Sequence, residues 1–184
     1  MVISRFISQL VSAAWAMLPA YVPNNAAVLS GGGDPIDGGR MWGDRRLLGD
    51  GKTWRGTAVG SVVGVLLAVV LNLVRDRVEA RLGVSLPEFS LGGAVGLAVG
   101  AMLGDIAASF LKRRSGRERG ASFPLLDQLD FVVGALGLAK LLSPVWFSRT
   151  FTPLRLVVVV VITPVLHLVT NGIAYLLGLK DEPY

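Results

Sequence analysis

The 184-residue sequence contains no cysteine and a single histidine, and only 17% of its residues are charged. Without cysteine the chain cannot form a disulfide, a thiolate metal site or a cysteine nucleophile. Soluble domains average about 25% charged residues. The scarcity of charge, together with a hydrophobic content of 52%, therefore indicates an integral membrane protein.

The apolar residues form five blocks, each about as long as the roughly 20 residues that cross a bilayer. We expect an all-α fold, a bundle of five transmembrane helices forming a single domain over 1–184. The expected spans are 2–21, 57–74, 89–111, 125–145 and 154–179. Two polar loops, at about 24–55 and 112–124, lie between the first and second spans and between the third and fourth. The first block could be a signal peptide, but it contains Gln9 and no clear cleavage site ends it.

The net charge is +5, which in a soluble protein would suggest a nucleic-acid partner. In a membrane protein the same excess follows from basic cytoplasmic loops that face anionic lipid. Both long loops and the C-terminus carry more Lys and Arg than the opposite face of the expected bundle. We therefore expect a multi-pass cell-membrane protein with its N-terminus outside, its C-terminus and both loops in the cytoplasm, and no nucleic-acid partner.

Small residues recur every four positions in two of the expected spans. These residues are Gly56, Gly60, Gly64 and Ala68 in the second span, and Gly92, Gly96, Gly100, Gly104 and Ala108 in the third. Such ridges let helix backbones approach closely inside a bilayer. We expect two packing seams, the second of which ends beside Asp105.

Acidic and basic residues gather where the third span ends and the fourth begins. Asp105, Ser109 and Lys112 share one helix face, and Asp127 and Asp130 share another. Between them lie the basic residues Lys112, Arg113, Arg114, Arg117 and Arg119. This pattern predicts a site for a divalent metal and a polyphosphate. Interfacial ion pairs, each contributing roughly 0–1 kcal/mol, are the alternative, but Asp130 lies about a turn inside an apolar helix, where an acid is costly.

The first loop closes with Gly51-Lys52-Thr53, which is similar to the end of a P-loop. A P-loop requires a glycine five residues before Gly51, and Arg46 stands there, so that interpretation fails. Lys52 and Arg55 still offer positive charge, and Thr53 could cap a helix whose N-terminus binds phosphate. A flexible glycine-rich loop with solvated charges explains this segment equally well.

Several segments together match the pattern of one known family: 19–26, 35–39, 46–56, 104–105 with Ser109, 112–114, 124–130 and 171–183. With them the chain resembles the archaeal CDP-archaeol synthases along essentially its whole length. A wider similarity joins it to bacterial phosphatidate cytidylyltransferases, which carry a similar Ser…Lys-Arg…Asp-x-x-Asp signature.

The resemblance implies a cytidylyltransferase that uses magnesium. CTP and 2,3-di-O-geranylgeranylglyceryl phosphate would give CDP-archaeol and pyrophosphate. Asp105, Asp127 and Asp130 would hold Mg²⁺, since hard cations prefer carboxylate oxygen, and Lys112 and Arg113 would complete the catalytic group by neutralising phosphates. The expected nucleotide-binding residues are Asn24, Asn25, Asp50, Lys52, Thr53, Arg55, Ser109 and Arg114.

Two further interpretations bear on the same residues. A small ion-coupled transporter could use Asp105, Asp127 and Asp130 as an ion relay, although it leaves the two basic loops unexplained. His167 lies near Thr163, Thr170 and Pro164 in the last span, where polar groups can satisfy the backbone freed by a proline. We expect a structural role there. Because prenyl chains remain in the bilayer, we also expect the cavity to open sideways for the lipid and to the cytoplasm for CTP.

Overall fold

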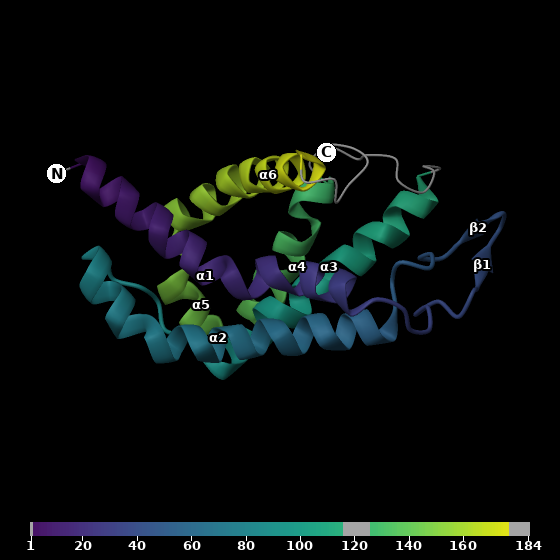
Figure 1. Ribbon diagram of the computed structural model, residues 1–184, viewed down its shortest axis with the longest axis horizontal. Helices are drawn as coiled ribbons and strands as arrows, with labels where there is room; N and C mark the ends of the chain where they lie inside the picture. Colours follow the sequence, from purple (N-terminus) through teal and green to yellow (C-terminus); the bar gives the residue numbers. More distant parts are fainter. Residues whose placement is uncertain (1, 116–125, 177–184) are drawn as a thin grey trace.

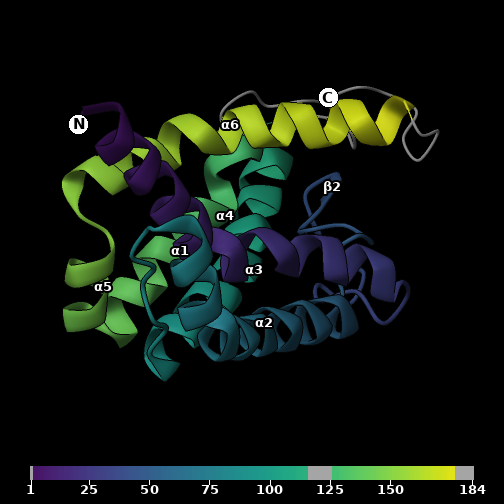
Figure 2. The ribbon, with the colours of Figure 1, turned by 60° about the vertical axis from the view of Figure 1, so that its left-hand side comes forward.

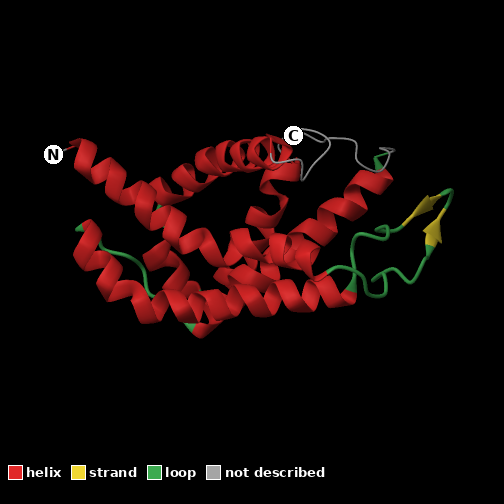
Figure 3. Cartoon of the chain, viewed as in Figure 1, coloured by secondary structure: helices red, strands yellow, loops and turns green. Residues whose placement is uncertain are grey.

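The computed structural model describes residues 2–115 and 126–176, and most of these residues are helical (Figures 1 and 3). The helices are α1 (Val2–Ser30), α2 (Trp54–Leu82), α3 (Leu91–Arg114), α4 (Leu126–Leu142), α5 (Pro144–Thr150) and α6 (Pro153–Leu176). Two short antiparallel strands, β1 (Met41–Trp42) and β2 (Arg45–Arg46), form a ribbon in the first loop. The ribbon and the N-terminus lie at opposite ends of the long axis (Figure 1).

The long helices begin and end where their sequences provide caps. Thr53 accepts a hydrogen bond from the Gly56 N–H at 3.0 Å and starts α2. Gly83, with a φ of 64°, ends α2 in the left-handed conformation that glycine tolerates. Ser90 caps α3 in the same way as Thr53, by accepting from the Gly93 N–H at 3.0 Å. Helix α2 therefore continues two turns beyond the expected end of the second span, as far as its glycine cap.

The first helix is longer than expected, and the predicted start of the first loop at about residue 24 is wrong. Helix α1 continues to Ser30 with Pro19 and Pro23 inside it, so Asn24 and Asn25 lie on a helix. Pro23 cannot donate to the carbonyl of Pro19, and Gly64 of α2 lies against that same carbonyl. Close packing on α2 thus accommodates a helix that proline would otherwise interrupt.

The predicted glycine seams are confirmed. A Cβ on Gly60 would overlap the carbonyl of Pro23, so the α2 seam packs on α1. A Cβ on Gly100 would overlap the backbone of Gly134, and one on Gly104 would overlap the carbonyl of Asp130. The α3 seam therefore brings α3 and α4 into backbone contact, which is the closest helix packing that small residues allow.

The fourth expected span does not continue to residue 145 as a single helix. Helix α4 ends at Leu142, and Pro144 begins α5, because a proline cannot donate within a helix and disfavours helical backbone at the residue before it. A bend of 76° then separates α5 from α6. Figure 2 shows α5 lying apart from the start of α6, with the chain turning between them.

Several helices are long and apolar enough to cross a membrane. In the described part these are α1 over Phe6–Ser30, α2 and α3, and the bent pair of α5 and α6 makes a fourth if it counts as one span. The 17 residues of α4 reach about 25 Å, less than the roughly 30 Å of a hydrocarbon core. The multi-pass membrane character is confirmed, and five separate spans stay a prediction.

Candidate active site

A polar cavity of about 460 Å³ lies between α1, α2, α3, α4 and α6, at the end of α2 that carries the first loop. Six residues singled out from the sequence line it: Asn24, Asn25, Lys52, Thr53, Asp105 and Asp130. They come from three helices and one loop. The structure therefore gathers half of the predicted nucleotide-binding residues and two of the three predicted metal ligands around one cavity.

Lys52 and Asp105 form an ion pair at the wall of this cavity. The two side chains are 24% and 23% exposed, so the pair is sheltered although it is not sealed from solvent. Lys52 precedes α2 and Asp105 lies on α3, and this contact ties the first loop to the helix bundle. A cation beside a carboxylate at the wall of a cavity suits the binding of a phosphate that itself carries a metal ion.

Asp130 reaches the same cavity because of the α3 seam. Gly104 allows α3 to touch the backbone of Asp130, and one carboxylate oxygen of Asp130 accepts a hydrogen bond from the Phe131 N–H at 2.6 Å. Gly104 is also the residue before Asp105. The glycine that brings the two helices together therefore fixes both carboxylates at the level of the cavity.

Asn24 contributes a buried oxygen to the cavity wall. Its Oδ1 has no hydrogen-bond partner among the residues that the structure describes. A buried acceptor without a partner costs free energy, and a bound ligand that donates to it, or a metal ion, would remove that cost. Two carboxylates and an amide oxygen are hard donors that suit Mg²⁺, so the described donor set fits the expected metal.

A polar contact that no sequence pattern indicated closes the cavity between α1 and α6. The hydroxyls of Tyr21 and Thr163 lie 2.9 Å apart, and Thr163 donates to the carbonyl of Val159 at 2.7 Å. Tyr21 must then donate to Thr163. This carbonyl is not the one that Pro164 deprives of a donor, which belongs to Val160, so the structural role expected of this region stays a prediction. The side chain of His167 lies outside the described residues.

Asp37 organises the first loop, although no pattern in the sequence indicated a role for it. Its side chain is 1% exposed and accepts hydrogen bonds from Arg46 and from the N–H groups of Gly39, Leu48 and Gly49. The Arg46 guanidinium, followed by these backbone donors, holds the pKa of the Asp37 carboxyl well below its usual range. The sequence does not indicate these five hydrogen-bond donors, because only the path of the loop brings them to the Asp37 carboxylate.

This ordered loop carries Lys52 to its position. The Ile36 N–H donates to the carbonyl of Lys52 at 2.8 Å, and the Trp54 N–H donates to the carbonyl of Asp34 at 3.1 Å. These two hydrogen bonds join the residues around Asp37 to the segment before α2. The alternative of a flexible, solvated loop therefore does not describe this segment.

The basic residues at the end of α3 contact the first loop. Arg114 donates to the carbonyls of Trp42 and Arg46 at 3.0 and 3.2 Å, and its guanidinium lies 5.2 Å from the centre of the Trp42 ring. The Arg113 guanidinium lies against Gly49. Neither these two residues nor the half-buried Lys112 belongs to the described lining of the cavity.

The other predicted site residues lie at varying distances from the cavity wall. Asp50 forms an ion pair with Arg46 at 2.8 Å, Arg55 is exposed on the first turn of α2, and Ser109 is half-buried on α3. Asp127 belongs to the first turn of α4, but its side chain lies outside the described residues. The complete group of three acids stays a prediction.

A family model of CarS-like CDP-archaeol synthases matches residues 6–184. The chain belongs to the CDP-archaeol synthase family. A CDP-archaeol synthase from Haloarcula marismortui is 68% identical over 178 residues, which cover 97% of this chain and 98% of the relative. One from Halobacterium salinarum is 65% identical with the same coverage, and one from Methanococcoides burtonii is 49% identical over 91% of this chain and 100% of the relative.

A solved structure, described as an intramembrane enzyme for archaeal membrane lipids biosynthesis, has the same fold. The similarity has a TM-score of 0.72 at 39% identity and covers 88% of this chain and 94% of the other. The resemblance inferred from the motifs is therefore confirmed, and the interpretation as an ion-coupled transporter is not favoured.

Proposed function

We propose that this chain transfers CMP from CTP to 2,3-di-O-geranylgeranylglyceryl phosphate, giving CDP-archaeol and pyrophosphate, and that the reaction takes place in the polar cavity. The observation that carries the proposal is the pairing of Lys52 with Asp105 at the wall of a cavity that also includes Asp130. In a family of CTP-dependent cytidylyltransferases, a sheltered space with both signs of charge is the natural place for a triphosphate to meet a lipid phosphate.

The reaction needs charge neutralisation more than it needs an activated nucleophile. An oxygen of the lipid phosphate attacks the α-phosphorus of CTP, and pyrophosphate leaves. Both reactants are anions, so catalysis consists mainly of positioning and electrostatic stabilisation. Lys52 would neutralise phosphate inside the cavity, and Lys112 and Arg113 would do so from the adjoining end of α3.

Magnesium would be held by Asp105 and Asp130, with Asp127 as the third ligand. When bound, the metal supplies a Lewis acid that offsets phosphate charge. Lys52 already contacts Asp105, so the same carboxylate would orient a cationic side chain and hold a metal ion. Asn24 would hold the nucleotide or the metal through its buried oxygen.

An apolar groove offers the lipid a route to Asp130. This groove, of about 380 Å³, lies between α3 and α4 and is lined by Leu103, Leu111, Leu129 and Val133. Asp130 belongs to the lining of both the groove and the polar cavity. We infer that the prenyl chains occupy the groove while the phosphate reaches the acids. Two long chains would stay in the bilayer, because exposing them to water costs about 25 cal/mol per Å².

We further propose that the loop end of the bundle faces the cytoplasm, where CTP is found. The absence of cysteine allows a direct test, since a single introduced cysteine is the only thiol in the chain. Asp44→Cys, in the ribbon, should react with a membrane-impermeant maleimide only after the cells are opened, and Arg77→Cys should react in intact cells. The reverse labelling would reject this orientation.

The proposed activity is tested by incubating purified protein with labelled CTP and a panel of lipid phosphates, with and without Mg²⁺. The expected result is a labelled CDP-lipid that requires both Mg²⁺ and a lipid that carries the phosphate, the isoprenoid glyceryl phosphate among them. Consumption of CTP without any lipid product, or no turnover with any lipid phosphate, would contradict the proposal.

A further inference from the structure

A second cavity, of about 520 Å³, lies at the opposite end of α2 from the polar cavity. Ser90 of its lining caps α3, and Asp105 lies about four turns along that helix, which makes the separation of the two cavities about 20 Å. The connection between α2 and α3 (84–90), helix α5 and the start of α6 surround the cavity, and its lining combines apolar Leu86, Phe89 and Trp146 with charged Glu88, Arg149 and Arg155. Its surface is therefore amphipathic, unlike a packing defect between apolar helices.

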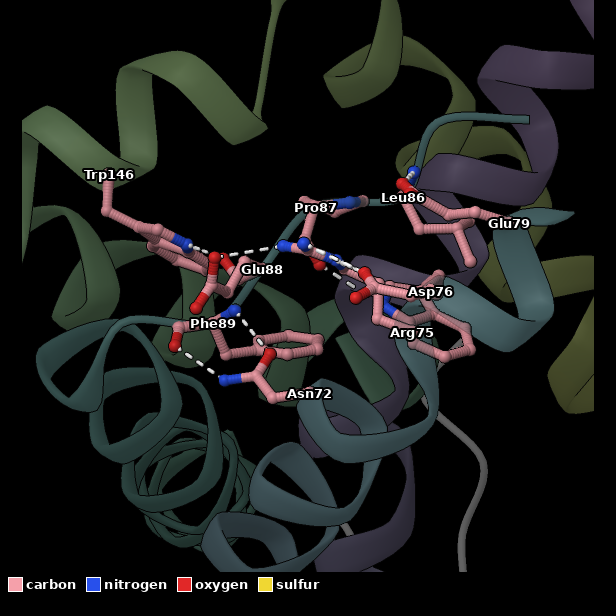
Figure 4. Close-up of polar contacts among 10 residues, drawn as sticks. Asn72, Arg75, Asp76, Glu79, Leu86, Pro87, Glu88, Phe89 and Trp146 are labelled. Atoms are coloured by element: carbon pink, nitrogen blue, oxygen red, sulfur yellow. Dashed lines mark hydrogen bonds and ion pairs between the residues drawn. The ribbon is translucent and has the colours of Figure 1, made fainter. Parts of the chain in front are cut away.

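The connection at 84–90 is a preformed wall, because neighbouring helices bind its backbone. The donors are Ser12 to the carbonyl of Ser85 (2.8 Å), Trp15 to Pro87 (3.2 Å), Trp146 to Glu88 (2.6 Å) and Asn72 to Phe89 (2.9 Å). The Leu86 and Phe89 N–H groups donate to Glu79 and Asn72 at 2.5 and 2.8 Å. Figure 4 shows Trp146 and Arg75 approaching Glu88 from opposite sides. This wall keeps its shape without a ligand.

Within the part of the chain that the structure describes, the two arginines of the cavity lining lack acidic partners. Arg75 pairs with Glu88 at 2.9 Å and with Asp76 at 3.0 Å, so the one acid of the lining already has a basic partner. Arg155 donates to two neutral acceptors, the Gln9 side chain at 2.9 Å and the carbonyl of Thr150 at 2.8 Å. For Arg149, the described part of the chain provides neither a hydrogen bond nor an ion pair. Two guanidinium groups without carboxylates favour an anion, above all a phosphate, which an arginine fork binds through two oxygens.

We propose that this cavity binds the phosphate headgroup of an anionic membrane lipid through Arg149 and Arg155. Two observations favour a lipid over free phosphate. The lining is partly apolar. In addition, Val145 of α5 and Leu154 of α6, each next in sequence to a lining residue, are 64% and 51% exposed and can contact acyl or prenyl chains. Trp146 is the residue type that marks a membrane–water interface. The site lies too far from Asp105 and Asp130 to hold the substrate, so it would bind a second, resident lipid.

The test compares lipid binding to the intact chain by native mass spectrometry and by the shift in Tm in detergent. The probes are phosphatidylglycerol, phosphatidylcholine with the same chains, and inorganic phosphate. Phosphatidylglycerol should bind and raise the Tm, whereas the other two should not. Arg149→Gln removes no hydrogen bond or ion pair to the described residues and should weaken binding about fivefold, as expected for one basic side chain at an anionic surface. Arg155→Gln should weaken it further.

Arg81→Gln is the matched control, because Arg81 is an exposed residue at the same end of the molecule and does not belong to the cavity lining. It should bind phosphatidylglycerol as the unchanged chain does. Equal binding of phosphatidylcholine, or unchanged binding in both Arg149→Gln and Arg155→Gln, would overturn the proposal. A Tm shift reproduced by inorganic phosphate alone would also overturn it, in favour of a free-anion site.

Discussion

Asp105 and Asp130 come from different helices and line one cavity because Gly104 removes the side chain that would separate α3 from α4. Replacing either acid with asparagine keeps the shape of the side chain and removes its charge. We expect Asp105→Asn and Asp130→Asn each to reduce kcat by at least about a hundredfold, the usual cost of losing one electrostatic contact to a transition state.

The measurement is turnover of labelled CTP at saturating Mg²⁺, with thermal unfolding in detergent as the test of folding. Asp44→Asn is the control, because Asp44 is an exposed acid of the ribbon outside the cavity lining. Asp127→Asn belongs to the same series. If two of these three acids can be replaced with near-normal activity, they do not form a metal site.

Lys52 contacts Asp105 directly, so its loss affects both charge and position. We expect Lys52→Ala to raise the KM for CTP more than the KM for the lipid phosphate, because the triphosphate carries more of the charge that Lys52 would neutralise. Steady-state kinetics with each substrate varied in turn measure the two values. Lys140→Ala, on the exposed surface near the far end of α4, should change neither. Unaltered CTP kinetics in Lys52→Ala would remove this residue from the nucleotide site.

Asp37 gives the first loop a dependence on pH. Its pKa is lowered in the folded protein, so its contribution to loop stability is present above the usual carboxyl value of about 3.9 and is lost as the pH falls below it. We expect limited proteolysis at the basic residues of 40–46 to increase in that acid range. Asp37→Asn should show the same increase at neutral pH, whereas Asp34→Asn, an exposed neighbour, should not. Equal cleavage of Asp37→Asn and the unchanged chain would show that Asp37 does not hold the loop.

At the scale of helices, the sequence predicted which elements touch better than where they end. Four-residue spacing of glycine specifies a contact face directly, and both seams were found. The end of α1 was missed because Pro19 and Pro23 look like stop signals, and only the packing of α2 against them reveals why the helix continues. Asp37 was missed for a related reason. Its five donors are brought together by the turns of the loop and by no periodic pattern.

Two glycines of α4 provide a matched pair for testing the α3 seam. A Cβ on Gly134 would overlap the backbone of Gly100 and Gly104, whereas a Cβ on Gly137 would meet nothing within 4 Å. Gly134→Ala should therefore destabilise the protein by about 1–3 kcal/mol through overpacking and reduce turnover by shifting Asp130. Gly137→Ala should be neutral or slightly stabilising, since alanine is the better helix former. Thermal unfolding and activity of the two variants, measured side by side, check this, and equal behaviour would argue against a tight seam.

For the whole molecule, the sequence predicted a membrane enzyme with its polar residues at one end. It did not predict which residues far apart in the chain contact each other. Basic loops far apart in the chain indicated a shared face, and the first loop and the end of α3 do meet through Arg114. The contact between Tyr21 and Thr163 joins residues 142 positions apart. Nothing in the spacing of either residue indicates the other, because that pairing depends on how α6 lies across α1.

The arrangement of the two cavities predicts how the lipid substrate is selected. The groove between α3 and α4 is almost wholly apolar and meets the polar cavity at Asp130. Apolar contact is non-directional, so we expect low selectivity for the lipid chains and strict selectivity for the phosphate. Short-chain and saturated lipid phosphates should still react, whereas a lipid alcohol without phosphate should not.

A bulky side chain in the groove should separate lipid access from nucleotide binding. Val133 lines the groove and is 70% exposed, whereas Leu141 of the same helix is 78% exposed and lies outside it. Val133→Trp should raise the KM for the lipid phosphate and leave that for CTP unchanged, because tryptophan would fill space that the chains need. Leu141→Trp should change neither value. If Val133→Trp behaves like Leu141→Trp, or if every altered chain in the panel is rejected, the lipid does not reach Asp130 through this groove.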